Sequence, residues 1–165
     1  GILRMVIFVI YIWLVAKMPD IKRVFMYHGA EHKSIFCYEA GLDLTVENVK
    51  KQSRFHPRCG TSFIFVILII SIFLSSALVV AFPSIDDNRT VWMIVKLLIL
   101  PLTVGIGYEF IKYAGKHNNI IVRILSAPGL WMQRITTREP DDSMIEIAIA
   151  AMTPCIPQDK SEDIW

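Results

Sequence analysis

The sequence predicts an all-α polytopic membrane protein. It would have three transmembrane helices, a cytoplasmic helical loop, and interfacial and cytoplasmic helices towards the C-terminus. Of the 165 residues 54% are hydrophobic, and the mean hydropathy is +0.49. Charged residues make up 19% and are unevenly spread; residues 62–82 contain none, over a length that can cross a bilayer. A soluble domain is usually less apolar than this, so these observations favour the membrane class.

The first span is predicted over residues 2–16, which are apolar apart from Arg4. The long side chain of Arg4 can extend towards a polar boundary. The run is shorter than the about 20 residues that a span needs, so we expect missing upstream residues to complete it. Pro19 disfavours a helical conformation at the residue before it, which ends the run.

The second span is predicted over residues 62–82 and the third over residues 91–108, with residues 83–90 as an external loop. Ser71 and Ser75 lie four residues apart in the second span, a spacing that favours a helix–helix contact. The third span contains Lys96 and Pro101. A proline inside a span kinks the helix and requires neighbouring groups to satisfy the backbone.

Residues 109–153 are predicted to be interfacial and cytoplasmic, followed by a polar tail over residues 154–165. The apolar residues 120–132 are too short to span and are interrupted by Pro128 and Gly129, so we expect a broken interfacial or re-entrant segment. The apolar spacing of residues 143–152 predicts a short helix.

The distribution of basic residues predicts the orientation. The loop over residues 17–61 contains eight of them and the loop over residues 83–90 contains one. Cytoplasmic loops carry the excess of Lys and Arg, so the larger loop is expected to face the cytoplasm. The net charge of +2 and the absence of a long basic stripe argue against nucleic-acid binding.

The segment YHGAEHKSIFCYEAG contains the main candidate site. We expect a helix over residues 27–40, with Gly41 ending it. His28 and His32 then lie about 40° apart on one helix face, where both can bind one metal ion. With Glu31 before His32, the pattern is H-x-x-E-H, the reversed zinc-protease signature. Glu31 would accept the proton of a metal-bound water.

Other residues could complete the site. Glu39 lies on the same helix face but roughly 10 Å beyond His32, which favours a supporting role or another site. Cys37 lies on the opposite face, where packing is expected. His56 and Cys59, three residues apart before the second span, are the better additional ligands. Four protein ligands would make a structural site, whereas three would leave a position for water. The remaining carboxylates that could approach are Glu109, Glu139 and Glu146.

Other interpretations remain open. The histidine face could rest on lipid headgroups, and residues 56–59 could be a helix-entry turn. A different function is a homo-oligomeric ion channel or transporter, with the His/Glu cluster as an ion site or gate. Pro101 and the ionisable Lys96 and Glu109 would then belong to a polar path. A scaffold that binds another membrane protein is a third alternative.

Four stretches together carry a resemblance to a known family: PDIKRVFMYHGAEHK, LTVENVKKQSRFHPRCGTSF, APGLWMQRITTREPDD and IEIAIAA. They resemble the YqhQ-like family of bacterial membrane proteins, from the first span to about Met152. The family is of unknown function and is often labelled a metal-dependent enzyme, and the resemblance implies a multi-pass protein of the bacterial inner membrane. By position, its signature polar residues are His28, Glu31, His32, Lys33, Glu39, His56, Arg58, Cys59, Glu109, Arg138 and Glu139.

The leading hypothesis is therefore a membrane-embedded, zinc-type metal-dependent hydrolase whose site faces the cytoplasm. His28 and His32 would be ligands, Glu31 the general base, and His56 and Cys59 the residues that complete the site. The expected partners are the lipid bilayer and further copies of the same chain. The sequence identifies no substrate.

Overall fold

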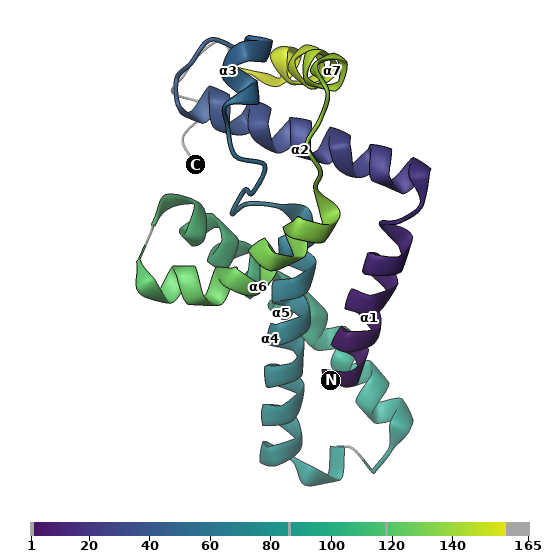
Figure 1. Cartoon of the computed structure of the whole chain (residues 1–165). Helices are drawn as coiled ribbons and strands as arrows, with labels where there is room; N and C mark the ends of the chain where they lie inside the picture. Colours follow the sequence, from purple (N-terminus) through teal and green to yellow (C-terminus); the bar gives the residue numbers. More distant parts are fainter. Residues whose placement is uncertain (1, 86, 118, 158–165) are drawn as a thin grey trace. The chain divides into compact units, whose positions relative to one another are not determined.

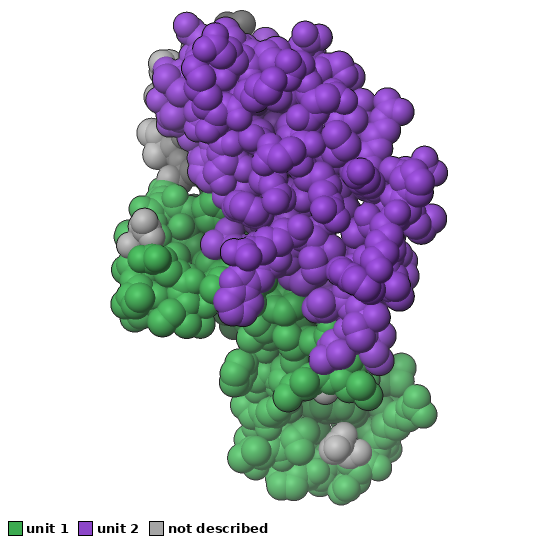
Figure 2. Space-filling model, in the orientation of Figure 1, with its two compact units in different colours: residues 1–5, 57–129 green, residues 6–56, 130–165 purple. Residues whose placement is uncertain are grey.

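The structure, a computed structural model, describes residues 2–85, 87–117 and 119–157 (Figure 1). Over these residues the chain forms seven α-helices, two 3-10 turns and no β-strand. The predicted all-α class is thereby confirmed. The chain divides into two compact units, drawn in two colours in Figure 2. Unit 1 comprises residues 1–5 and 57–129, and unit 2 comprises residues 6–56 and 130–165.

Unit 1 is built mainly from two long helices that pack side by side, α4 (Gly60–Ala81) and α5 (Arg89–Lys116) (Figure 1). The 3-10 turn η1 (Pro83–Ile85) follows α4. The side chain of Asn88 accepts hydrogen bonds from the first N–H groups of α5 and so caps it. A Cβ on Gly107 would lie 3.1 Å from the Phe63 ring, so a glycine at this position lets α4 and α5 approach closely.

The two long helices have the length and composition of membrane spans. Their apolar side chains are widely exposed, which suits contact with lipid tails better than contact with water. Helices α1 (Ile2–Val15) and α2 (Pro19–Glu39) pass the same test only as a pair, bent by 100° at the break between them. The described residues therefore contain two candidate spans, or up to three if the bent pair is one span. The sidedness of the loops stays a prediction.

Unit 2 is organised around α2, which packs against α3 (Val46–Lys50) and α7 (Asp142–Met152). Their shared core contains Ala30, Cys37, Val49, Met144 and Ile145. The packing role predicted for Cys37 is confirmed. Helix α2 ends where the sequence predicts, because Gly41 adopts a positive φ of 68°, a conformation that glycine accepts without strain.

The expected break at Pro128 and Gly129 is wrong. Helix α6 (Ile120–Thr136) continues through both residues. The proline removes the hydrogen bond that its own N–H would donate to the carbonyl of Ile124 and crowds that carbonyl, but the helix continues on both sides of it. The glycine is buried, and a Cβ at this position would lie 2.8 Å from Cβ of Ser62. Close packing against Ser62, rather than a break, explains this glycine.

Candidate metal centre

His28 and His32 lie together on one face of α2, as the four-residue spacing predicts. Their rings meet edge to face, with centroids 4.3 Å apart. A ring nitrogen of one lies within 4.8 Å of a ring nitrogen of the other. Because zinc binds histidine nitrogen at about 2.0–2.1 Å, small ring rotations would bring both nitrogens onto one ion.

Both imidazoles are oriented by main-chain carbonyl groups. Nδ1 of His28 lies 2.8 Å from the carbonyl oxygen of Thr136, and Nδ1 of His32 lies 2.6 Å from that of Arg54. Thr136 is the last residue of α6, where a carbonyl has no N–H partner within its own helix. A carbonyl only accepts, so each Nδ1 donates. In the neutral imidazole the lone pair is then on Nε2, as in metal-binding histidines.

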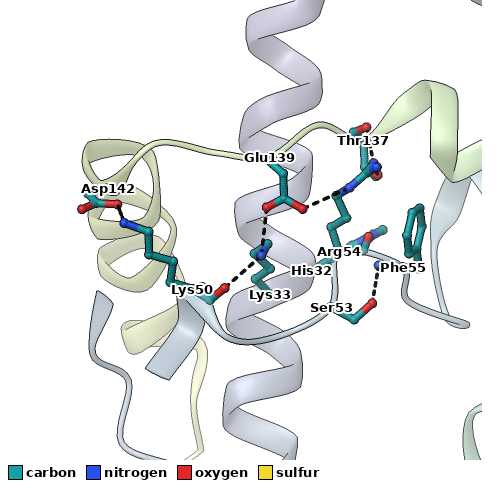
Figure 3. Close-up of polar contacts among 9 residues, drawn as sticks. All are labelled: His32, Lys33, Lys50, Ser53, Arg54, Phe55, Thr137, Glu139 and Asp142. Atoms are coloured by element: carbon teal, nitrogen blue, oxygen red, sulfur yellow. Dashed lines mark hydrogen bonds and ion pairs between the residues drawn. The ribbon is translucent and has the colours of Figure 1, made fainter. Parts of the chain in front are cut away.

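A group of polar and charged residues holds these carbonyls against α2; we call Lys33, Arg54, Thr137 and Glu139 the Glu139 cluster (Figure 3). The buried amino group of Lys33 lies 2.9 Å from one oxygen of Glu139 and 3.1 Å from the carbonyl of Lys50. Nε of Arg54 lies 3.3 Å from the other oxygen of Glu139, and the Arg54 guanidinium donates to the Thr137 carbonyl at 2.6 Å. The cluster therefore joins both carbonyl-bearing segments to the histidine helix.

His56 is buried near the pair, with its ring centroid 5.7 Å from that of His32. Gln133 holds its backbone on both sides, accepting from the His56 N–H at 2.8 Å and donating to the His56 carbonyl at 2.6 Å. Nε2 of His56 lies 3.3 Å from a carboxylate oxygen of Glu39. This contact explains Glu39, which lies too far along α2 to share an ion with His28.

The other predicted residues are distributed over both units. Glu31 is exposed on α2 beside His32, and Glu139 belongs to its own cluster. Cys59, in unit 1, is the N-cap residue of α4, and its sulfur lies 3.0 Å from the Thr61 hydroxyl. Glu109, also in unit 1, is exposed on α5. Lys96 lies in unit 1 above the Trp92 ring.

Sequence reasoning did not single out the residues that orient the site. Gln133 is fully buried, and the acceptors at Arg54 and Thr136 are main-chain atoms. A lone amide among the apolar residues of α6 was an available signal for Gln133. No comparable signal exists for a carbonyl, because every residue has one.

Comparisons with known proteins agree with the resemblance in the sequence. A family model described as "Protein of unknown function (DUF1385)" matches residues 1–158. The chain is 41% identical over 150 residues to the uncharacterized protein YqhQ of Bacillus subtilis (strain 168). This match covers 90% of the chain but only 45% of the relative. No solved structure matches. The chain belongs to the DUF1385 family of proteins of unknown function.

Proposed function

We propose that this chain is part of an integral membrane protein that carries a zinc-type metal centre on α2 and acts as a metal-dependent hydrolase. The observation that carries the proposal is the shared orientation of His28 and His32. Each donates from Nδ1 to a main-chain carbonyl, so the lone pair of the neutral ring is on Nε2, as in histidines that bind metal. This common orientation of the two rings favours metal binding over the alternative in which the histidines contact lipid headgroups.

We propose Cys59 as the third ligand. The residue types suit this assignment, because zinc binds both imidazole and thiolate. Cys59 follows His56 by three residues, so the chain limits the distance between their Cα atoms to about 11 Å. Three protein ligands leave a fourth position for water, the pattern of catalytic zinc. The pair of His56 and Glu39 would then support the site.

A metal ion at this position would supply Lewis acidity and lower the pKa of a bound water. Glu31 precedes His32 directly and has an exposed carboxylate. We therefore assign to Glu31 the acceptance of a proton from water at the site, which is the task of the glutamate in H-x-x-E-H enzymes.

Metal analysis tests the ligand assignment. Protein purified in maltoside detergent without chelators should contain about one transition-metal ion per chain. Inductively coupled plasma mass spectrometry measures this metal content. The substitutions His28→Ala and His32→Ala should each remove most of it. The matched control is His117→Ala, which changes an exposed histidine after the end of α5. Wild-type protein without metal, or equal loss in the control, would contradict the assignment.

The substitution Glu31→Gln tests the catalytic part separately. The variant should keep its metal but lose metal-dependent hydrolysis of chromogenic ester, phosphoester and peptide substrates by about 10²–10⁴-fold, the contribution of a general base. Metal loss in Glu31→Gln would make the glutamate a ligand instead of a base. Full activity in this variant would exclude it from the chemistry.

A second candidate function is an ion channel or transporter with the histidine cluster as a gate. Its support is Pro101 inside α5, which leaves the carbonyl of Leu97 without its usual helical donor within a candidate span. Such a site can act as a hinge or line a polar path. Reconstituted liposomes should then conduct ions, and the flux should change in Pro101→Ala. Absence of flux under every tested ion gradient would count against this function.

A further inference from the structure

A cavity of about 240 Å³ in unit 1 contains two basic side chains, Arg4 from the start of α1 and Lys96 from α5. Three serines of α4, Ser71, Ser75 and Ser76, contribute to the same wall. Among the described residues that line the cavity there is no Asp or Glu. Two positive charges thus share one cavity without an acidic side chain among the described residues of its wall.

The position of the cavity along the helices makes this arrangement costly. Ser71 lies about 16 Å from the start of α4, near its middle, and Lys96 lies about 10 Å from the start of α5. Both helices are candidate spans. A cation at such a depth is unfavourable unless it is paired or faces a polar space. Within the described part of the chain neither Arg4 nor Lys96 forms an ion pair with a carboxylate.

We propose that this cavity binds a phosphate group. Two cations match the charge of a phosphate, and the flat guanidinium of Arg4 can donate two parallel hydrogen bonds to its oxygens. The hydroxyls of Ser71 and Ser75, one helical turn apart, add neutral donors. The cavity volume exceeds that of a water molecule by several-fold, so it can hold an oxyanion with some water. This proposal is independent of the metal centre, which draws on other residues.

The phosphate can come from two sources, inorganic phosphate or the headgroup of an anionic phospholipid. In both cases the same oxygens contact the same side chains. The first arm of the test uses the whole chain, delipidated in maltoside and free of phosphate buffer. Added inorganic phosphate should raise the midpoint of thermal unfolding and bind saturably, about one per chain, in equilibrium dialysis.

Three variants test the cavity. Lys96→Met and Arg4→Met should each weaken phosphate binding by at least about tenfold, because each removes a charged hydrogen-bond donor. Ser75→Ala should weaken it less, by about two- to tenfold. The matched control is Lys116→Met, which removes one positive charge from the exposed last turn of the same helix. It should leave the affinity unchanged.

Thermal unfolding without phosphate separates lost binding from lost structure. Lys96→Met removes from a span a charge that has no carboxylate partner among the described residues, together with its contact on the Trp92 ring. The two effects oppose each other, so the midpoint without phosphate should stay close to that of the wild type, while the shift with phosphate disappears. Lys96→Arg keeps the charge and should keep the binding. Equal affinity in Lys96→Met and wild type would overturn the proposal, as would equal weakening in Lys116→Met.

The second arm identifies a lipid source. Mass spectrometry of mildly purified protein should detect about one phosphatidylglycerol per chain if the headgroup is the natural ligand, and the lipid should be lost in Lys96→Met. Phosphatidylglycerol should then displace radiolabelled phosphate. A wild type that binds neither inorganic phosphate nor an anionic lipid would overturn the proposal.

Discussion

At the scale of single residues, the ion pairs of unit 2 differ in their surroundings and therefore in their expected contributions. The side chain of Lys33 is 6% exposed and contacts Glu139, whereas Lys50 and Asp142 are 60% and 59% exposed. Water screens an exposed pair, which contributes little. A buried ammonium that loses its charged partner retains its desolvation cost. The two pairs have similar distances of 2.9 and 2.7 Å, but we expect different contributions to the free energy of unfolding.

Removing one carboxylate from each pair tests this difference. Glu139→Gln should lower the free energy of unfolding by about 1–2 kcal/mol, less than for a fully buried pair because Glu139 itself is largely exposed. Asp142→Asn, the matched control, should change it by less than about 1 kcal/mol. Denaturant titration in mixed micelles measures both values. Equal effects in the two variants would show that the burial of Lys33 is unimportant.

At the scale of helices, α2 contacts the segment after α6 closely because residue 29 of α2 is a glycine and has no Cβ. A Cβ on Gly29 would collide with the carbonyl oxygen of Arg138 and lie 3.2 Å from its carbonyl carbon. The segment is pinned here because the Arg138 N–H donates to the Phe25 carbonyl at 2.8 Å. Thr136, two residues before Arg138, supplies the carbonyl that orients His28. Close packing at Gly29 therefore supports the geometry of the candidate metal centre.

The substitution Gly29→Ala should accordingly destabilise the protein by about 1–3 kcal/mol, the usual cost of overpacking, and lower its metal content. Gly105→Ala is the matched control, since a Cβ at this helical position meets no atom within 4 Å. It should be neutral or stabilising by up to about 1 kcal/mol because alanine favours helix. Unfolding and elemental analysis of both variants provide the comparison. A Gly29→Ala variant as stable as the wild type would contradict the close packing.

The start of α7 introduces a dependence on pH. Asp141 caps this helix by accepting from the Ser143 hydroxyl at 2.7 Å and from the Met144 N–H at 2.9 Å. These two hydrogen bonds, the hydroxyl first, hold the pKa of Asp141 below its usual value. A depressed pKa means that the carboxylate form stabilises the fold. This stabilisation is complete above the unfolded pKa of about 3.9 and is lost as the pH falls through the lower folded value.

A comparison with Asp141→Asn isolates this effect, because asparagine also caps helices but does not ionise. The wild type should have the higher unfolding midpoint at a pH of about 5, and its advantage should shrink towards a pH of about 3. The pKa of Glu47 is also lowered, by its hydrogen bond with Lys51, but this contribution is common to both proteins and cancels. A difference that stays constant over this range would exclude Asp141 as its source.

At the scale of the whole molecule, local patterns predicted the helices but not the contacts between distant segments. Apolar runs and Gly41 were sufficient for α4 and for the end of α2, because each depends on neighbouring residues. The orientation of His28 depends on a carbonyl 108 residues away. The continuity of α6 at Gly129 likewise depends on packing against Ser62. Such interactions appear only when the chain is folded.

The orientation of the molecule in the membrane remains a prediction with a direct test. Ser84 lies in the predicted external loop and Cys155 in the predicted cytoplasmic tail, and both are exposed. Between them only α5 qualifies by itself as a span among the described residues, so they should lie on opposite sides. Cys37 and Cys59 are buried and should react slowly.

A membrane-impermeant maleimide distinguishes the two sides in intact cells of a bacterium without an outer membrane. Ser84→Cys, made together with Cys155→Ser, should be labelled in intact cells, because its loop carries few basic residues and is expected outside. The natural Cys155 should be labelled only after the membrane is permeabilised, and the single change Cys155→Ser should remove that signal. The reverse pattern would place the loop over residues 17–61, and with it His28 and His32, on the outer side. Labelling of both positions in intact cells would mean that α5 does not cross the membrane.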